Sequence, residues 1–359
     1  MPKPAVLFGG PSPEHDVSIL TGLQAARALG DVTGVYWAKD GRFWEVDAGL
    51  EAEAFADGVP RRAGQLRLQA GEGLLGRRRA LELSAVVNCC HGGPGEDGSV
   101  QAALDLAGIA YTGPTVAGAA LGMDKLAFGG VVTAAGLPSL PRVALTPSTT
   151  GVPWEGPCIV KPRFGGSSIG IQVVRDVATA VALLPAVPHL RAGAVAEPYR
   201  RDAYDLNVSV RSWPDLQLSN IERPLRAAGG DILGYGDKYL GGEGMASAPR
   251  ELPAAVPDAV ADRLREMART VAGLVGLRGV ARIDFLAAGD DGHELYVNEI
   301  NTIPGSLARY LWVDPAVPFR RFLDDMLEEA VRRPSFAWST QGADGTALRA
   351  AGGIADKLA

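Results

Sequence analysis

The chain has 359 residues, of which 47% are hydrophobic and 21% are charged, and its formal net charge at pH 7 is −6. This length exceeds what one hydrophobic core usually serves, so we expect two or three domains. The negative charge excludes a general electrostatic attraction to nucleic acid or acidic membranes, although local basic pockets for phosphate remain compatible with it.

The cysteines and the N-terminus indicate where in the cell the protein is found. Cys89, Cys90 and Cys158 show neither a zinc nor a redox spacing, which is typical of small buried residues in a reducing compartment. The apolar run before Gly9 is too short for a secretory signal, and no segment approaches the length of a membrane span. We therefore expect a cytoplasmic protein that has no membrane partner.

The N-terminal third alternates apolar strands with helices. Residues 5–8 form an apolar run that ends in two glycines, and a helical pattern follows over 17–29. A second strand over 81–90 leads into a glycine-rich loop and then a helix over 99–107. This alternation predicts a parallel sheet with both faces covered. Ligands bind at the carboxyl ends of such strands, where both polar loops lie.

The second of these loops contains His91 and four glycines between residues 90 and 98. Considered alone, His91 would more often be a hydrogen-bonded structural residue than a catalyst. Clustered glycines indicate a backbone that must come close to another group, so here a functional and a structural role carry equal weight.

A second glycine loop follows a connecting segment over 138–157 that is rich in Pro, Thr and Ser. A strand delivers Lys161 into the run 165–168, which reads Gly-Gly-Ser-Ser. A lysine and free backbone amides suit phosphate oxygens. The loop is not a Walker loop, because its lysine precedes the glycines. Alone it is a weak signal, since glycine-serine turns are common.

Residues 194–199 predict a further apolar strand, which includes Glu197 and Tyr199. Its backbone could bind an adenine edge, and Asp205 could accept a ribose hydroxyl. For Asp205 alone, a plain surface carboxylate is the better interpretation. Residues 229–248 contain seven glycines and little periodicity, which is typical of a lid loop that would present Lys238 and Tyr239 to a reaction centre.

Two strands near the C-terminus supply oxygen ligands. Side chains alternate along a strand, so Arg282 and Asp284 share one face, as do Glu299 and Asn301. Hard oxygen donors suit Mg²⁺, which substrate phosphates usually complete, so these strands predict an ATP site. The alternative is a polar strand end closed by the Pro304-Gly305 turn. The last helix, near 319–333, carries a core stripe, and we expect the tail over 334–359 to be partly disordered.

Together these residues resemble the D-alanine–D-alanine ligase family of ATP-grasp enzymes over about residues 4–333. The matching stretches are 9–18, 91–98 with Gln101, 111–113 with 123–125, 161–170, Lys238-Tyr239, 281–285 and 298–305. The resemblance implies an ATP-grasp fold of mixed α/β and α+β class. An N-terminal α/β domain with a parallel sheet would span 1–120, a central domain 121–211 and a C-terminal domain 212–333, with ATP between the last two. It also implies a cytoplasmic homodimer that makes D-alanyl-D-alanine for peptidoglycan.

The resemblance further implies a nucleotide site for ATP with two Mg²⁺ ions, which Mn²⁺ can replace. The metal ligands would be Asp284, Glu299 and Asn301. The nucleotide would be held by Lys125, Lys161, Ser167, Lys238 on the lid, the hinge from Glu197 to Tyr199, and Asp205 at the ribose.

For the amino acids, the resemblance assigns Glu14 to the first ammonium group, in a network with Ser167 and Tyr239. Arg282 and the N–H of Gly305 would stabilise an oxyanion. This set suits a reaction in which ATP converts a carboxylate to an acyl phosphate that an amine then attacks. A closed lid would protect the acyl phosphate from water.

One departure concerns the second substrate. Where the family usually continues with a threonine and then a serine that holds a carboxylate, this chain has Ser306 to Trp312. Ser306 or Arg309 could supply that contact, and we favour Arg309 because a guanidinium binds carboxylate bidentately; a surface position is its alternative. A ligase for another dipeptide or a depsipeptide is a second interpretation, and a non-catalytic nucleotide-binding module is a remote third.

Overall fold

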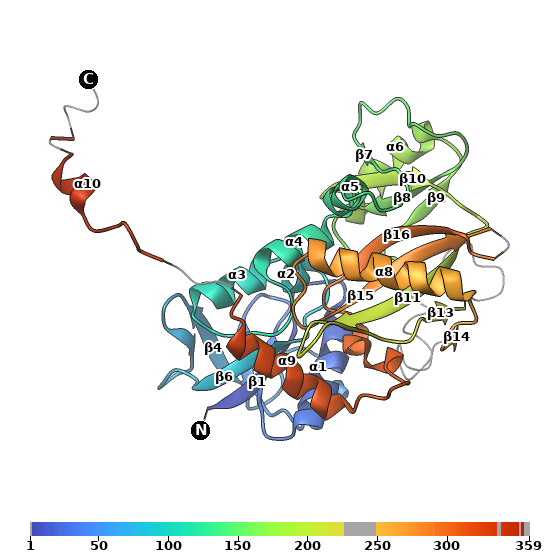
Figure 1. The fold of residues 1–359 in the computed structure, drawn as a ribbon. Coiled ribbons are helices and arrows are strands. Elements are labelled where there is room, and N and C mark those ends of the chain that lie inside the picture. The colour runs from blue at the N-terminus through green and yellow to red at the C-terminus, as the bar shows by residue number, and fades with distance from the viewer. Residues whose placement is uncertain (1, 226–248, 290, 336–338, 352, 355–359) are drawn as a thin grey trace.

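The computed structural model in Figure 1 describes residues 2–225, 249–289, 291–335, 339–351 and 353–354. The expected lid, with Lys238 and Tyr239, lies outside these residues. Among the described residues, we find no helix with the length and apolar character that a membrane crossing needs.

The N-terminal sheet contains six strands in the order β5-β4-β3-β2-β1-β6. Their bounds are β1 Lys3–Gly9, β2 Thr33–Trp37, β3 Phe43–Val46, β4 Gly64–Gln69, β5 Gly73–Leu75 and β6 Leu83–Asn88. Strand β1 pairs in parallel with β2 and β6, as the sequence predicts. From β2 to β5 the pairing is antiparallel. The connections between β2 and β3 and between β4 and β5 are too short for a parallel crossover, whereas the longer one between β3 and β4 contains η1.

Both faces of this sheet are covered, and alternate residues of β1 explain how. Val6 and Phe8 pack in one cluster with α1 (His15–Leu29), whereas Ala5 and Leu7 pack in another with α3 (Ser99–Leu106). Helix α1 comes so close to β1 that a Cβ on Gly22 would lie 2.4 Å from that of Phe8. The short helices η1 (Ala52–Phe55) and α2 (Gly93–Glu96) complete this part of the chain.

The central sheet has four antiparallel strands in the order β7-β10-β8-β9. Their bounds are β7 Val143–Leu145, β8 Cys158–Pro162, β9 Gln172–Val174 and β10 Ala194–Pro198. Helix α6 (Val177–Ala186) and η2 (Pro188–Leu190) cover a small core around Val160 and Ala196.

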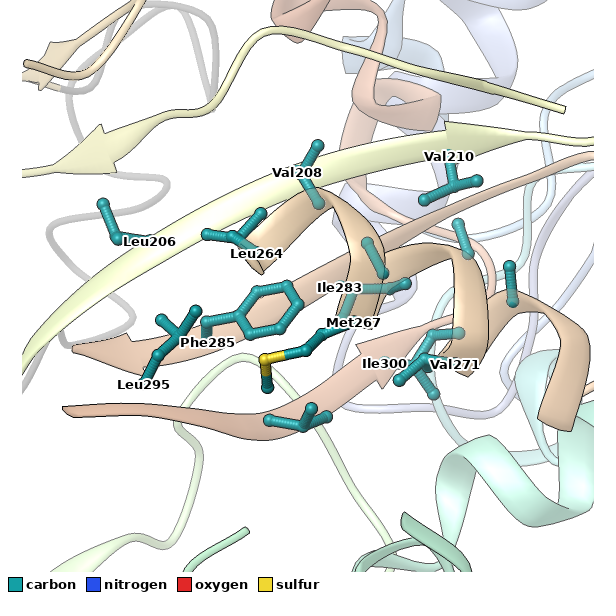
Figure 2. Close-up of a cluster of buried hydrophobic side chains, with 14 of the residues drawn as sticks. Leu206, Val208, Val210, Leu264, Met267, Val271, Ile283, Phe285, Leu295 and Ile300 are labelled. Atoms are coloured by element: carbon teal, nitrogen blue, oxygen red, sulfur yellow. The ribbon is translucent and has the colours of Figure 1, made fainter. Parts of the chain in front are cut away.

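The third sheet has the order β12-β11-β15-β16, with bounds β11 Tyr204–Arg211, β12 Gln217–Leu218, β15 Val280–Ala288 and β16 Glu294–Asn301. Helix α8 (Asp258–Leu274) packs Leu264, Met267 and Val271 on Ile283 and Phe285 (Figure 2). The pair β13 (Arg223–Pro224) and β14 (Arg250–Glu251) lies beside the sheet, and α4 (Val116–Met123) and α5 (Lys125–Ala134) precede the central strands.

Sheet membership and packing refine the expected domain bounds. The division at 211 falls at the end of β11, whose partners are β12 and β15, so the third sheet begins at Tyr204. Helix α5 contributes Phe128 and Val132 to the core of that sheet. Helix α9 (Phe319–Arg332) instead packs with α1 and β6 of the N-terminal part (Figure 1). The tail contains the four-residue helix α10 (Thr346–Arg349).

Candidate active site

Four polar side chains share one face of β15 and β16. The antiparallel register sets Asp284 opposite Glu299 and Arg282 opposite Asn301, and directly opposed residues point to the same face. The other face carries Ile283, which is fully buried in the core under α8.

A β-bulge interrupts this pairing. Asp284 pairs with Glu299 but Phe285 pairs with Val297, so Asn298 is the extra residue. Its side-chain oxygen accepts a hydrogen bond from Lys161 Nζ at 3.2 Å. The bulge therefore turns one more polar group toward the central sheet.

Arg282 is held by two carboxylate oxygens. Its Nε and Nη2 donate to the two oxygens of Asp284 at 2.6 and 2.7 Å, and Asn301 Nδ2 donates to the same carboxylate at 3.0 Å. Burial alone lowers the pKa of Arg282, but Asp284 and Tyr310 raise it well above its usual value. A permanently charged guanidinium is thus fixed in one orientation.

The two lysines reach this face from different elements. Lys125 begins α5, whose first turn is capped by Asp124, and its Nζ lies 3.2 Å from Glu299 Oε2. Lys161 comes from β8, and its Nζ donates to Glu197 Oε2 at 2.7 Å. Burial raises the pKa of Glu197, but Lys161 and Arg142 outweigh this and hold it below the usual range.

The expected hinge residues have particular backbone and side-chain partners. The Glu197 carboxylate is occupied by Lys161 and Arg142, so any adenine contact at this position would come from the backbone. The N–H of Tyr199 donates to Pro157 O at 2.9 Å. Asp205 is half-buried on β11, opposite Leu286.

Glu14 explains why both loops are rich in glycine. Ser167 Oγ hydrogen-bonds to Glu14 Oε1. A Cβ on Gly92 would lie 2.2 Å from Glu14 Oε2, and one on Gly166 would lie 3.1 Å from it. The backbones of the two loops close around this one carboxylate, and a side chain at Gly92 would have to displace it.

His91 binds the turn that contains Gly305. Its Nδ1 lies 2.6 Å from the carbonyl of Ile303, and its Nε2 lies 2.8 Å from the Thr21 hydroxyl. A carbonyl only accepts, so we assign the ring proton to Nδ1 and the Thr21 proton to the bond with Nε2. Burial, opposed by Glu14, lowers the pKa of His91, which favours this neutral form. The hydrogen bonds of His91 therefore position the turn that contains Gly305.

Glu96 holds the same turn. Its carboxylate accepts hydrogen bonds from the N–H of Ile303 at 2.8 Å, the Thr302 hydroxyl at 3.3 Å and the N–H of Gly92 at 3.1 Å. Burial, aided by the charge of Glu14, raises the pKa of Glu96 to about 7.

The chain after Gly305 adopts an uncommon conformation. Ser306, Leu307 and Ala308 have φ values of 49°, 51° and 50°, which form a left-handed turn inside η4 (Gly305–Leu311). Such residues cost about 1–2 kcal/mol each, so packing must hold them in place. Leu307 and Ala308 are fully buried, and the N–H of Ser306 donates to Thr21 Oγ1 at 3.1 Å.

This turn directs Arg309 away from the site. Its guanidinium carbon lies 5.2 Å from the ring centre of Phe319, at the start of α9. Arg309 does not line either of the two cavities described next. Ser306 does not line them either, so the cavities favour neither residue as the acceptor contact.

Two neighbouring cavities bring several of the candidates together, although Lys161 and Asp284 line neither of them. Both are lined by Glu14, Glu96, Glu299 and Asn301. One adds Lys125 and Gly165, whereas the other adds His91, Ser167, Arg282 and Gly305.

The donor set fits magnesium. The described residues hold no group of three or more His, Cys, Asp or Glu side chains that could bind a metal. Mg²⁺ does not need such a cage, since one or two carboxylates with phosphates and waters suffice. Asp284 and Glu299 on paired strands, with the amide of Asn301 beside them, offer that chemistry.

Comparison with known proteins decides the family. A model described as D-ala D-ala ligase N-terminus matches residues 3–114, and one described as D-ala D-ala ligase C-terminus matches 150–328. The chain belongs to the D-alanine–D-alanine ligase family. A D-alanine–D-alanine ligase of Bradyrhizobium sp. (strain ORS 278) is 33% identical, covering 92% of this chain and 95% of the relative. One of Mycobacterium sp. (strain KMS) is also 33% identical, covering 92% and 96%.

Solved structures confirm the predicted fold class. The D-alanine–D-alanine ligase of Helicobacter pylori has a TM-score of 0.73 at 24% identity, covering 94% of this chain and all of the other. The VanG D-Ala:D-Ser ligase of Enterococcus faecalis has a TM-score of 0.72 at 21% identity, covering 92% and 99%. Because ligases with different acceptors share this fold, the likeness says nothing about the second amino acid.

Several residues of the candidate active site were not predicted from the sequence. They are Thr21, Glu96, Arg142 and Asn298. Glu96 lies in the glycine loop, and its acidic character was a usable signal. The others act through partners that are distant in the sequence, which no local pattern reveals.

Proposed function

We propose that this protein is an ATP-dependent ligase that joins two molecules of D-alanine through an acyl phosphate. The observation that carries the proposal is the convergence of Glu14, Arg282, Glu299 and Gly305 on adjoining cavities with Lys125. An amine-binding carboxylate, phosphate-binding cations and oxyanion donors are the three kinds of group that this chemistry needs.

The phosphoryl half of the reaction would use the lysines. Lys125 and Lys161 neutralise the transferring phosphoryl group and hold it in line with the attacking carboxylate of the first amino acid. When bound, Mg²⁺ would be held by Asp284, Glu299 and Asn301 and would supply Lewis-acid stabilisation of phosphate charge. The resemblance implies two such ions.

The ligation half would use Arg282 and the Pro304-Gly305 turn. As the second amine attacks, negative charge develops on the carbonyl oxygen, where the guanidinium and the N–H of Gly305 can stabilise it. One such donor is typically worth ~3 kcal/mol of barrier. Glu14, in contact with Ser167, binds the ammonium group of the first amino acid.

We also propose the identity of the second amino acid, D-alanine, and the assembly state. The family also suggests a cytoplasmic homodimer, which sedimentation at several protein concentrations would test. A ligase for another dipeptide or a depsipeptide remains the second candidate, because the turn after Gly305 carries residues that differ from the family pattern.

A phosphate-release assay tests the function. The purified protein with Mg·ATP is offered D- and L-amino acids and D-hydroxy acids, one at a time and in pairs, and products are identified by mass. We expect D-alanine alone to stimulate phosphate release and to yield D-alanyl-D-alanine. Release only with another pair would select the second candidate, and nucleotide binding without any release would favour the non-catalytic module.

A further inference from the structure

Arg142 lies behind both lysines and is not part of the cavities described above. It directly precedes β7, and its side chain is only 4% exposed. Each of its three guanidinium nitrogens has a partner. Nε donates to Glu197 Oε1 at 2.8 Å, Nη1 donates to the carbonyl of Lys125 at 2.7 Å, and Nη2 donates to the carbonyl of Asn298.

These three partners belong to three different elements. Lys125 starts α5, Glu197 lies on β10 of the central sheet, and Asn298 is the bulged residue of β16 in the third sheet. A planar guanidinium fixes its acceptors in one plane and at set directions, which a lysine could not do. Arg142 thus connects the central sheet to both elements that face it.

Each partner either belongs to the proposed phosphate site or contacts a residue of it. The Glu197 carboxylate uses its other oxygen to hold Lys161 at 2.7 Å. The Asn298 side chain also accepts from Lys161, and its neighbour Glu299 lies 3.2 Å from Lys125. Because Arg142 shares Glu197, the carboxylate orients Lys161 without neutralising the local positive charge.

A glycine makes the required space on α5. A Cβ on Gly129 would lie 2.7 Å from Arg142 Nη1 and 2.8 Å from its Cδ. The next residue, Gly130, has nothing within 4 Å of the corresponding position. The guanidinium therefore packs against α5 at Gly129, where the helix has no side chain in its path.

We propose that Arg142 is a positioning residue that sets Lys125 and Lys161 for the nucleotide phosphates and joins the central and third sheets at this point. The inference rests on the proposed function, since it assigns these lysines to ATP. It adds a group that acts through other residues and touches no substrate.

The main test compares Arg142→Met with Arg211→Met. Arg211 pairs with the buried Asp325 and lies over Trp312, so its loss removes a similar ion pair that involves none of the lysine partners Glu197, Asn298 and Glu299. We expect Arg142→Met to raise the KM of ATP and the Kd of adenylyl imidodiphosphate by roughly 10- to 100-fold, the range found when a residue that orients a metal ligand is lost. The KM of D-alanine should change much less, and Arg142→Lys should restore little of the affinity. Arg211→Met should retain the wild-type affinity for nucleotide.

A second pair of variants decides the matter if Arg142→Met does not fold. Gly129→Ala should weaken adenylyl imidodiphosphate binding, whereas Gly130→Ala should not, although both place a methyl group on α5. Wild-type nucleotide affinity in both Arg142→Met and Gly129→Ala, or an equal loss for ATP and D-alanine, would overturn the inference. A wild-type protein that neither binds nor hydrolyses ATP would instead overturn the proposed function.

Discussion

The phosphate side and the acceptor side of this site are built in different ways. On the phosphate side, charged side chains hold one another. Lys125 pairs with Glu299, and Lys161 pairs with Glu197. On the acceptor side, side chains of the N-terminal part hold a backbone turn, through Thr21, His91 and Glu96.

This difference indicates where each kind of change should act. Charge on the phosphate side can be removed without moving the backbone, so its loss should appear in nucleotide binding and in the phosphoryl step. The acceptor side depends on conformation, because three consecutive left-handed residues must be held by their contacts. Changes there should appear first in stability and in the affinity for the second amino acid.

Glu299→Gln gives the largest effect that we expect. Glutamine keeps the shape but removes a charged ligand of the Mg²⁺ ion, and that ion would supply several kcal/mol of stabilisation to the phosphate charge, so kcat should fall by about 100-fold or more. The fold should be unchanged, since the side chain is 23% exposed and lies outside the cores. Steady-state phosphate release measures the effect, with the distant Glu328→Gln as the control. Wild-type turnover in Glu299→Gln would remove Glu299 from the reaction.

Lys161→Ala should act on nucleotide binding. Loss of one charge-assisted hydrogen bond costs about 1.5–3 kcal/mol, which corresponds to roughly 10- to 100-fold in the Kd of an ATP analogue. Calorimetry measures this, and Lys39→Ala, at an exposed lysine, is the control. If the two variants bind the analogue equally well, the glycine loop is not a phosphate site.

The two sides also differ in how far sequence alone predicts them. Lys161, Asp284 and Glu299 could be found because residue type and strand alternation carry their chemistry. The bulge at Asn298 depends on the partner strand, so the local sequence contains no sign of it. Arg309 was expected at the acceptor because of its charge, yet a left-handed turn of non-glycine residues cannot be foreseen and points it at Phe319.

Glu96 allows a test of the acceptor side by pH. Its pKa rises from 4.5 to about 7 on folding, so between these values the folded state binds a proton that the unfolded state has lost. The contribution of Glu96 to the free energy of unfolding is fully present below pH 4.5. It is lost as the pH rises through 7, and the total loss is about 3 kcal/mol.

The measurement is urea unfolding of wild type and Glu96→Gln from pH 4.5 to 8. Glutamine does not titrate, so the difference in free energy of unfolding between the two should shift steadily in favour of the variant as the pH rises. It should become constant above the folded pKa. A difference that is independent of pH would mean that Glu96 is already ionised throughout this range, and that the turn is held by an anion.

Arg309→Ala should have the smallest effect and separates two candidates for the acceptor contact. The side chain stacks on Phe319, which is worth about 0.5–1 kcal/mol at most sites of this kind. Its Nε is buried and has no hydrogen-bond partner among the described residues, a cost that the substitution removes. The two effects oppose each other, so the free energy of unfolding should change by less than about 1 kcal/mol.

Because the guanidinium lies away from the cavities, the KM of both amino acids and of ATP should stay at the wild-type values. Ser306→Ala is the matched comparison, since Ser306 follows Gly305 directly and its N–H is already fixed by Thr21. A raised KM for the second amino acid in Ser306→Ala alone would give that contact to Ser306, whereas a raised KM in Arg309→Ala alone would show that the turn rearranges to bring the guanidinium into the site.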